Sequence, residues 1–370
     1  MRYILAPKNT LMIRGPASCR LLNGEAEVLG APLDGQRRLT INRDKQLPVE
    51  ARTETHLEIS MGKSAEIFES EGSTIPTSWT VAADALAEMK TGRVILIGMT
   101  DVGKSTLTTY LTNKLLKNQL SLHIIDGDIG QADIGPPTTI GYSAPTTSIS
   151  SLVELKPESI IFIGHTSASQ VETKIIDGIR RLSNRAQDSL TIINTDGWVL
   201  DPEAISYKIR MIASTEPDLV IGLATGRELQ PVLSGSRARA LKVDTAKDVL
   251  ARSRSDRREA RITGYRRFLE GARTRTISLR AVDLSTPVGF PLVHGTQAWE
   301  LNSLIVGLLD DEGYMLEIGV LMGFANDTAR VYCRSVERVH KIEVGYLKLS
   351  KDGTELGYFE PRNRSETTIL

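Results

Sequence analysis

The feature that most constrains this chain is a glycine-rich loop set between an apolar run and a helical pattern. Residues 94–97, Val-Ile-Leu-Ile, form a β-branched, apolar run that is typical of a buried strand. The segment from Gly98 to Ser105 has the form G-x-x-x-x-G-K-S, and apolar residues then recur at helical spacing from Leu107 to Leu116. The sequence therefore predicts a strand, a phosphate-binding loop of the Walker A type and a helix, in this order.

The residue types in this loop suit a triphosphate. Gly98 and Gly103 can adopt positive φ and bring backbone N–H groups around a phosphate, and the helix that follows points its positive dipole end at the anion. Lys104 can reach the β- and γ-phosphates, and the Ser105 hydroxyl is placed to ligate Mg²⁺. We expect nucleotide contacts from Gly98, Met99, Thr100, Asp101, Val102, Gly103, Lys104, Ser105 and Thr106. A chance G-K-S at a helix cap is the alternative, and it would not require the preceding strand.

A second G-K-S, at residues 62–64, provides an internal comparison. Position 57 is Leu where a phosphate loop needs its first Gly. The stretch that follows is too short to form a helix before Gly72. We therefore expect a turn between two strands here.

The composition excludes several classes of protein. The 370 residues include 45 basic and 45 acidic side chains, so no general attraction to nucleic acid or to membranes is expected. No apolar stretch is long enough to span a membrane. The two cysteines, Cys19 and Cys333, match no metal-binding or redox spacing. We expect a cytoplasmic, globular protein of two or three domains without a membrane partner.

The order of the predicted elements indicates three regions. Residues 1–78 contain short strands and polar turns, which predicts an N-terminal β-sandwich-like domain. Residues 79–275 alternate buried strands with helices, which predicts an α/β fold: a central P-loop NTPase domain with a doubly wound, mainly parallel sheet. Residues 276–370 predict a C-terminal β-rich or α+β domain. Ligands of a doubly wound sheet bind at the carboxyl ends of its strands, so the loops there form the candidate site.

The second predicted strand of the sheet ends in Asp126-Gly127-Asp128-Ile129-Gly130-Gln131. A carboxylate at this place in a phosphate-loop protein holds Mg²⁺ directly or through water. Of two acidic residues two positions apart, one can serve the metal and the other can accept a proton from an attacking hydroxyl. The alternative is that both are turn residues beside the glycines. The phosphate loop upstream favours the chemical interpretation.

Two further loops follow strands of the same sheet. Residues 164–167, Gly-His-Thr-Ser, offer small polar groups that could touch a substrate phosphate or cap the next helix. Residues 194–198, Asn-Thr-Asp-Gly-Trp, lack the lysine of a guanine-binding Asn-Lys-x-Asp motif, which argues against a dedicated GTPase. Trp198 could stack on a nucleobase or lie in the core, and the sequence leaves both interpretations open.

The segment from residue 237 to 275 is strongly basic. It contains thirteen basic and five acidic residues, a local net charge of +8 in a neutral chain. Arg254, Arg257, Arg258 and Arg261 have the spacing of one side of a helix. A solvated charged face is one interpretation. We favour an Arg-rich lid over the transferring phosphoryl group, because the segment follows the last predicted strand of the nucleotide-binding domain.

Taken together, these motifs resemble those of the polynucleotide 5′-hydroxyl kinases related to the kinase subunit of the eukaryal mRNA 3′-end cleavage factor. The family also includes nucleolar rRNA-processing kinases and archaeal RNA kinases. The resemblance rests on residues 98–106, 126–131, 194–198 and 257–265. The phosphate loop is generic, whereas the D-x-G-Q, T-x-G-W and R-x-x-x-R forms, in this order, are much more specific.

The resemblance implies that the chain transfers the γ-phosphoryl of ATP to a 5′-hydroxyl end of RNA, or of DNA, with Mg²⁺. It implies catalytic roles for Lys104, Asp128, Arg257 and Arg261, metal binding by Ser105 and Asp126, and acceptor binding by Gln131, Thr166 and Trp198. The family's acceptor clasp resembles T-x-P-x-x-N. This chain has Thr-Ser-Ala-Ser-Gln-Val at residues 166–171, so only the threonine carries over.

Two rival interpretations remain at this point. A phosphate-loop kinase of similar architecture could act on a small molecule, although a small substrate needs no extended basic path. A catalytically silent ATP-binding scaffold of an RNA-processing complex is the other rival. The presence of Lys104, Asp128 and the lid arginines argues against it. The sequence does not identify protein partners.

Overall fold

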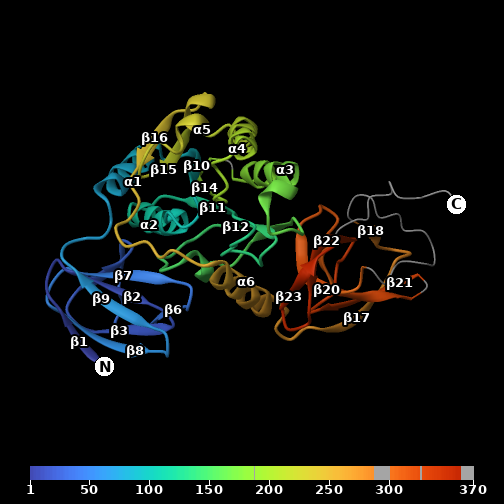
Figure 1. Ribbon diagram of the computed structural model, residues 1–370, viewed down its shortest axis with the longest axis horizontal. Coiled ribbons are helices and arrows are strands. Elements are labelled where there is room, and N and C mark those ends of the chain that lie inside the picture. Colours follow the sequence, from blue (N-terminus) through green and yellow to red (C-terminus); the bar gives the residue numbers. More distant parts are fainter. Residues whose placement is uncertain (187, 287–300, 326, 360–370) are drawn as a thin grey trace. The chain divides into compact units, whose positions relative to one another are not determined.

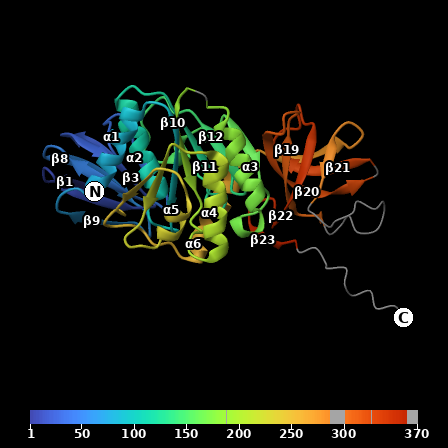
Figure 2. The same ribbon diagram turned by 90° about the horizontal axis from the view of Figure 1, so that it is seen from above.

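The computed structural model describes residues 1–186, 188–286, 301–325 and 327–359 (Figures 1 and 2). The chain forms two compact units. The first consists of residues 1–128, 142–158 and 172–257, and the second consists of residues 129–141, 159–171 and the chain from 258 onward. The predicted three-domain division at residues 78 and 275 remains a prediction.

Two antiparallel sheets form the N-terminal part of the first unit (Figure 1). Their strand orders are β1-β8-β3-β6 and β5-β4-β7-β2-β9. Apolar side chains alternate with more exposed ones, as in β8, where Leu57 and Ile59 are buried. The second G-K-S lies in the turn between β8 and β9, as predicted. The strands are β1 (Arg2–Leu5), β2 (Thr10–Arg14), β3 (Ala17–Asn23), β4 (Ala26–Val28), β5 (Ala31–Pro32), β6 (Leu39–Ile41), β7 (Gln46–Ala51), β8 (Thr55–Met61) and β9 (Glu66–Ser70).

The central sheet has the strand order β13-β12-β11-β14-β10-β15-β16. The pairs that β10 makes with β14 and β15, and that β11 makes with β14, are parallel. Most residues in these strands are buried, as expected where helices cover both faces of a parallel sheet. The strands are β10 (Gly92–Gly98), β11 (Leu122–Gly127), β12 (Thr139–Ser143), β13 (Ser159–Phe162), β14 (Leu190–Thr195), β15 (Leu219–Leu223) and β16 (Ala240–Val243).

The helices of the first unit fall into two groups. One group is α1 packed on α2, and the other is α4 packed on both α3 and α5. The chain moves from β10 to β11 in one direction along the sheet and from β14 to β15 in the other, so right-handed connections put α2 and α4 on opposite faces. The predicted doubly wound α/β fold is confirmed. The helices are α1 (Thr77–Met89), α2 (Lys104–Lys117), α3 (Glu172–Ser183), α4 (Pro202–Thr215) and α5 (Gln230–Gly235).

The second unit contains a mainly antiparallel sheet of strand order β17-β21-β20-β19-β22-β18, with β23 paired to β22. Apolar residues of β13 and of helix α6 (Arg254–Leu269), such as Phe162, Tyr265 and Leu269, share one hydrophobic core with this sheet. The β-rich character predicted for this region is confirmed. The strands are β17 (Arg273–Ser278), β18 (Asp283–Ser285), β19 (Leu304–Leu309), β20 (Met315–Ala325), β21 (Thr328–Cys333), β22 (Lys341–Leu349) and β23 (Glu355–Tyr358).

The segment predicted as a lid, residues 237–275, is not one element. Its first part contains β16, which pairs with β15 in the central sheet, and its last residues begin β17. The arginines predicted to share a helix side do lie on α6. In the part of the chain that the structure describes, no helix has both the length and the apolar character that crossing a membrane requires.

Trp79 of α1 provides a test of the packing beneath the phosphate loop. Its buried ring lies 5.8 Å from that of Tyr110 on α2, and its Nε1 donates a 2.7 Å hydrogen bond to the carbonyl of Asp244. Trp79→Ala should lower the free energy of unfolding by about 3–5 kcal/mol, measured by denaturant titration. Val81→Ala, on the same helix at a side chain that is 52% exposed, should change it by less than about 0.5 kcal/mol. Equal losses would contradict this assignment.

Candidate functional site

The phosphate loop connects the end of β10 to the start of α2, as the motif requires. Gly103 immediately precedes the helix with φ 98°, a conformation that favours glycine. Gly98 is needed for space, because a Cβ there would lie 2.8 Å from the carbonyl oxygen of Leu223. The motif thus requires glycine at the two positions for different physical reasons: backbone conformation at Gly103 and lack of space at Gly98.

Lys104 lies inside the loop rather than in solvent. The side chain is only 6% exposed, and its Nζ donates hydrogen bonds to the carbonyls of Gly98 (2.8 Å) and Met99 (2.7 Å). Burial lowers the pKa of Lys104 to about 8, against the attraction of the Asp128 carboxylate, which raises it. The Lys104 cation therefore lies at the place where the motif predicts that a phosphate binds.

The side chains predicted to hold Mg²⁺ converge beside the loop. Parallel pairing of β11 and β14 puts Asp126 next to Asn194. Nδ2 of Asn194 donates to Oδ1 of Asp126 (3.0 Å) and to Oγ of Ser105 (3.3 Å). Asp126 and Asn194 are both buried. Asn194 is a residue that the sequence reasoning did not assign to the site, although it occupies the carboxyl end of a predicted strand.

This donor set suits a small, hard cation. It offers the oxygen atoms of Ser105 and Asp126, and the buried Oδ1 of Asn194 accepts no hydrogen bond within the described structure. Mg²⁺ prefers oxygen ligands and keeps several waters, so it needs few side chains. The described residues contain no cluster of three or more His, Cys, Asp or Glu that could hold another kind of metal. The residues present therefore fit Mg²⁺.

Asp128 lies at the end of β11, two residues after Asp126. Its backbone N–H points at Oδ1 of Asp126 (3.4 Å), and its side chain is partly buried. The carboxylate is close enough to Lys104 to raise the pKa of that lysine. A carboxylate beside a phosphate-binding lysine has the position expected of a proton acceptor.

The loop that carries Trp198 is fixed by a buried ion pair. Lys208 of α4 is fully buried, and its Nζ lies 2.9 Å from Oδ2 of Asp196, which also accepts a hydrogen bond from the Tyr207 hydroxyl (2.9 Å). Oδ1 of Asp196 accepts from the Trp198 backbone N–H (3.0 Å). The indole of Trp198 is only partly buried, and its Nε1 donates to Oδ2 of Asp201. The role of Trp198 as a stacking surface for a nucleobase remains a prediction.

Arg257, a predicted lid residue, contacts the phosphate loop itself. Its Nη2 donates to Oδ2 of Asp101 (2.8 Å), and Arg252 forms an ion pair with the other oxygen (2.9 Å). Burial raises the pKa of Asp101, but the bonds from Arg257 and Arg252 outweigh it, so the net shift is downward. Asp101, Arg252 and Arg257 thus form one charged cluster.

Three other predicted site residues belong to the second unit. Both Arg261 and Arg258 bind Glu355 of β23, with Arg261 Nε 2.5 Å from Oε1. Gln131 donates through Nε2 to the carbonyl of Gly130, and the Thr166 hydroxyl bonds to that of Tyr358. The roles predicted for Gln131, Thr166 and Arg261 remain predictions.

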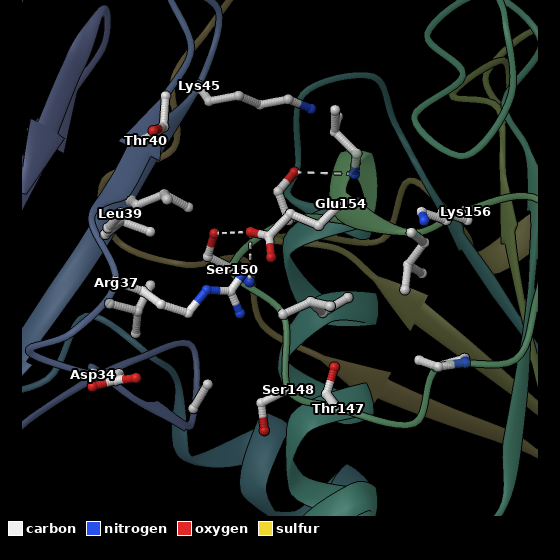
Figure 3. Close-up of a pocket in the computed structure, with 18 of the residues that line it drawn as sticks. Asp34, Arg37, Leu39, Thr40, Lys45, Thr147, Ser148, Ser150, Glu154 and Lys156 are labelled. Atoms are coloured by element: carbon white, nitrogen blue, oxygen red, sulfur yellow. Dashed lines mark hydrogen bonds between the residues drawn. The ribbon is translucent and has the colours of Figure 1, made fainter.

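A separate cavity of about 780 Å³ lies in the first unit, between residues 28–47 of the N-terminal sheets and residues 143–158 (Figure 3). Hydroxyl groups line much of it, and Arg37, Lys45 and Lys156 contribute the cations seen in the close-up. Glu154 accepts hydrogen bonds from the backbone and hydroxyl of Ser150. No predicted site residue lines this cavity, which is therefore distinct from the phosphate loop.

The chain is similar to known proteins in sequence and in fold. Residues 98–271 match the family model described as mRNA cleavage and polyadenylation factor CLP1 P-loop. The chain is 27% identical to polyribonucleotide 5′-hydroxyl-kinase PH0197 of Pyrococcus horikoshii, over 81% of this chain and 97% of that protein. It is 25% identical to polyribonucleotide 5′-hydroxyl-kinase MJ1315 of Methanocaldococcus jannaschii, over 72% of this chain and 90% of that protein.

A solved structure of the wild-type Clp1p–Pcf11p complex contains a chain of the same fold. The TM-score is 0.73 at 14% sequence identity, and the match covers 94% of this chain and 97% of that chain.

The lowered pKa of Lys104 predicts pH-dependent binding of a nucleoside triphosphate. A bound phosphate favours the charged lysine, so above pH 8 the free protein must first take up a proton. Affinity should therefore fall by up to about tenfold per pH unit above 8. Conversely, the cost of burying this charge disappears as the pH rises from 8 towards 10.5, which stabilises the free protein. Calorimetry in two buffers of different ionisation enthalpy measures affinity and proton uptake, and pH-independent affinity without uptake would refute this.

Proposed function

We propose that this chain, whose residues 98–271 match the CLP1 P-loop family model and which is similar over most of its length to polyribonucleotide 5′-hydroxyl-kinases, transfers the γ-phosphoryl group of ATP to the 5′-hydroxyl of an RNA strand. One observation carries the proposal. The phosphate-loop lysine, two carboxylates and an asparagine converge at the carboxyl ends of β10, β11 and β14. This is the set of groups that phosphoryl transfer requires.

ATP would bind to residues 98–106, with its β- and γ-phosphates against Lys104 and the first turn of α2. Ser105 and Asp126 would hold Mg²⁺, and Asn194 would orient both through its Nδ2. Bound there, Mg²⁺ would neutralise charge on the phosphoryl oxygens. The remaining chemistry falls to the side chains of this chain.

The proposed reaction is an in-line displacement. The 5′-hydroxyl oxygen bonds to the γ-phosphorus while the bond from that phosphorus to the oxygen shared with the β-phosphate breaks, and ADP leaves. Asp128 takes the hydroxyl proton, and Lys104 stabilises the charge that develops on the phosphoryl group. Arg257, already at the loop through Asp101, supplies a further positive charge.

The basic segment supports a polymeric acceptor. A polynucleotide carries a phosphate at every nucleotide, so a local charge of +8 matches it better than it matches a nucleoside. Trp198 offers a partly exposed ring for the terminal base. RNA is the acceptor named for the archaeal relatives, and DNA is the alternative.

Replacing the proposed base separates chemistry from binding. Asp128→Asn keeps the size of the side chain but cannot accept the proton, so phosphoryl transfer should fall by at least about 100-fold. ATP affinity measured well below pH 8, where Lys104 is protonated, should stay within about threefold, because Asp128 is placed to contact the acceptor rather than the nucleotide. The assay measures labelled phosphate on a 5′-hydroxyl RNA oligonucleotide, with free nucleosides in parallel. Unchanged turnover would remove Asp128 from the mechanism, and transfer to nucleosides alone would favour a small-molecule kinase.

The chain offers a matched control for the phosphate-loop lysine. Lys104→Ala should abolish both ATP binding and transfer, because the cation at the β- and γ-phosphates is lost. Lys63→Ala removes the lysine of the other G-K-S, which is exposed in the turn between β8 and β9, and should change neither. ATP bound by the wild type without any transfer to RNA would instead support a scaffold role.

A further inference from the structure

The loop after β13, residues 164–167, is fixed to the C-terminal sheet. The Tyr346 backbone N–H donates a 2.8 Å hydrogen bond to the carbonyl of Gly164. The backbones of Gly164 and Gly345 approach so closely that a Cβ on Gly164 would lie 2.7 Å from the Cα of Gly345. This contact fixes the loop through its main chain, so the side chains of the loop can contact other groups.

The side chain that follows makes an aromatic pair with β23. The imidazole of His165 is 9% exposed and stacks on the ring of Tyr358, with ring centres 4.7 Å apart and planes 27° apart. Its Nδ1 accepts a hydrogen bond from the Ser167 N–H (2.9 Å), and the Tyr346 ring lies edge-on to the imidazole with ring centres 5.8 Å apart. Burial lowers the pKa of His165, so the ring is neutral at pH 7. The imidazole is thus a fixed, uncharged support.

Tyr358 itself is far from buried. Its side chain is 43% exposed although one face rests on His165 and its hydroxyl bonds to that of Thr166. Both partners restrict the ring, so little rotational freedom is left to lose when something stacks on it. An exposed, pre-oriented aromatic ring is a typical surface for an unpaired base.

The same strand also binds an arginine of α6. Glu355, three residues before Tyr358, binds Arg261 through both carboxylate oxygens. One four-residue strand therefore contacts both the predicted acceptor loop and an arginine of α6. Within the second unit the aromatic ring therefore lies near Thr166 and Arg261, the two residues there that are predicted to bind the acceptor and the transferring phosphate.

We propose that the stacked pair of His165 and Tyr358 is a platform for an unpaired nucleobase of the acceptor strand. This inference rests on the proposed function and on the predicted contact of Thr166 with an acceptor phosphate. Because the Tyr358 hydroxyl bonds to Thr166, the base on the platform belongs to the nucleotide whose phosphate contacts Thr166 or to the nucleotide next to it. The platform requires a single-stranded segment, since a paired base cannot present its face.

The test combines protein variants with RNA acceptors that carry one abasic nucleotide at successive positions from the 5′ end. In the wild type, one position should raise the KM for RNA by roughly 5- to 150-fold, the range of stacking one base on an aromatic ring. Tyr358→Ala should raise the KM for intact RNA similarly, and the abasic effect at that position should disappear. Tyr358→Phe keeps the ring and should retain the abasic effect.

Two controls make the result specific. Phe68→Ala removes an exposed ring of similar accessibility, 41%, from β9 and should leave the KM for RNA unchanged. Tyr358→Leu keeps an apolar side chain over His165 and should still lose the abasic effect, even if Tyr358→Ala fails to fold. The KM for ATP should not change in Tyr358→Leu.

The outcomes separate this inference from the function on which it rests. If the wild type phosphorylates RNA but the abasic profile of Tyr358→Leu equals that of the wild type at every position, the platform is refuted and the kinase stands. If the wild type phosphorylates no oligonucleotide, both the platform and the proposed kinase function are refuted.

Discussion

The register between β11 and β14 is the constraint on which the site depends. Parallel pairing puts Asp126 beside Asn194, and the adjacent β10 delivers the phosphate loop to the same edge of the sheet. A shift of one residue in that pairing would turn the side chains at this edge to the opposite face. The buried strands therefore do more than form a core, because their ladder of hydrogen bonds sets the distances between Ser105, Asp126 and Asn194.

The first unit also contains two buried lysines. Lys104 and Lys208 are both almost inaccessible, and each is compensated differently. Lys208 has a carboxylate partner in Asp196, so its role is to hold a loop. Lys104 donates to two carbonyl oxygens and has a lowered pKa. An anion at the loop would satisfy this lysine better than the protein does alone, which is how a binding site differs from a structural ion pair.

The local sequence pattern was sufficient to predict some features of the fold and the site but not others. The phosphate loop and Asp126 were predictable because strand, glycine spacing and helix follow one another in sequence. The strands β12 and β16 were missed, since one is a short run after two prolines and the other lies within a basic segment. The bonds of Asn194 to Ser105, of Arg261 to Glu355 and of Thr166 to Tyr358 join residues far apart in the chain, so no local signal encodes them. Charge and the position after the last predicted strand suggested one lid, whereas the structure divides that segment among β16, α6, the start of β17 and the loops between them.

The contact between Gly164 and Gly345 has a consequence for substitutions in this loop. Neither position can gain even a methyl group without moving the two backbones apart. Of the residues that follow, His165 and Thr166 contact Tyr358, whereas Ser167 and Ser169 are exposed and less restricted. Substitutions at these two exposed positions should therefore leave the backbone of the loop where the Gly164–Gly345 contact holds it.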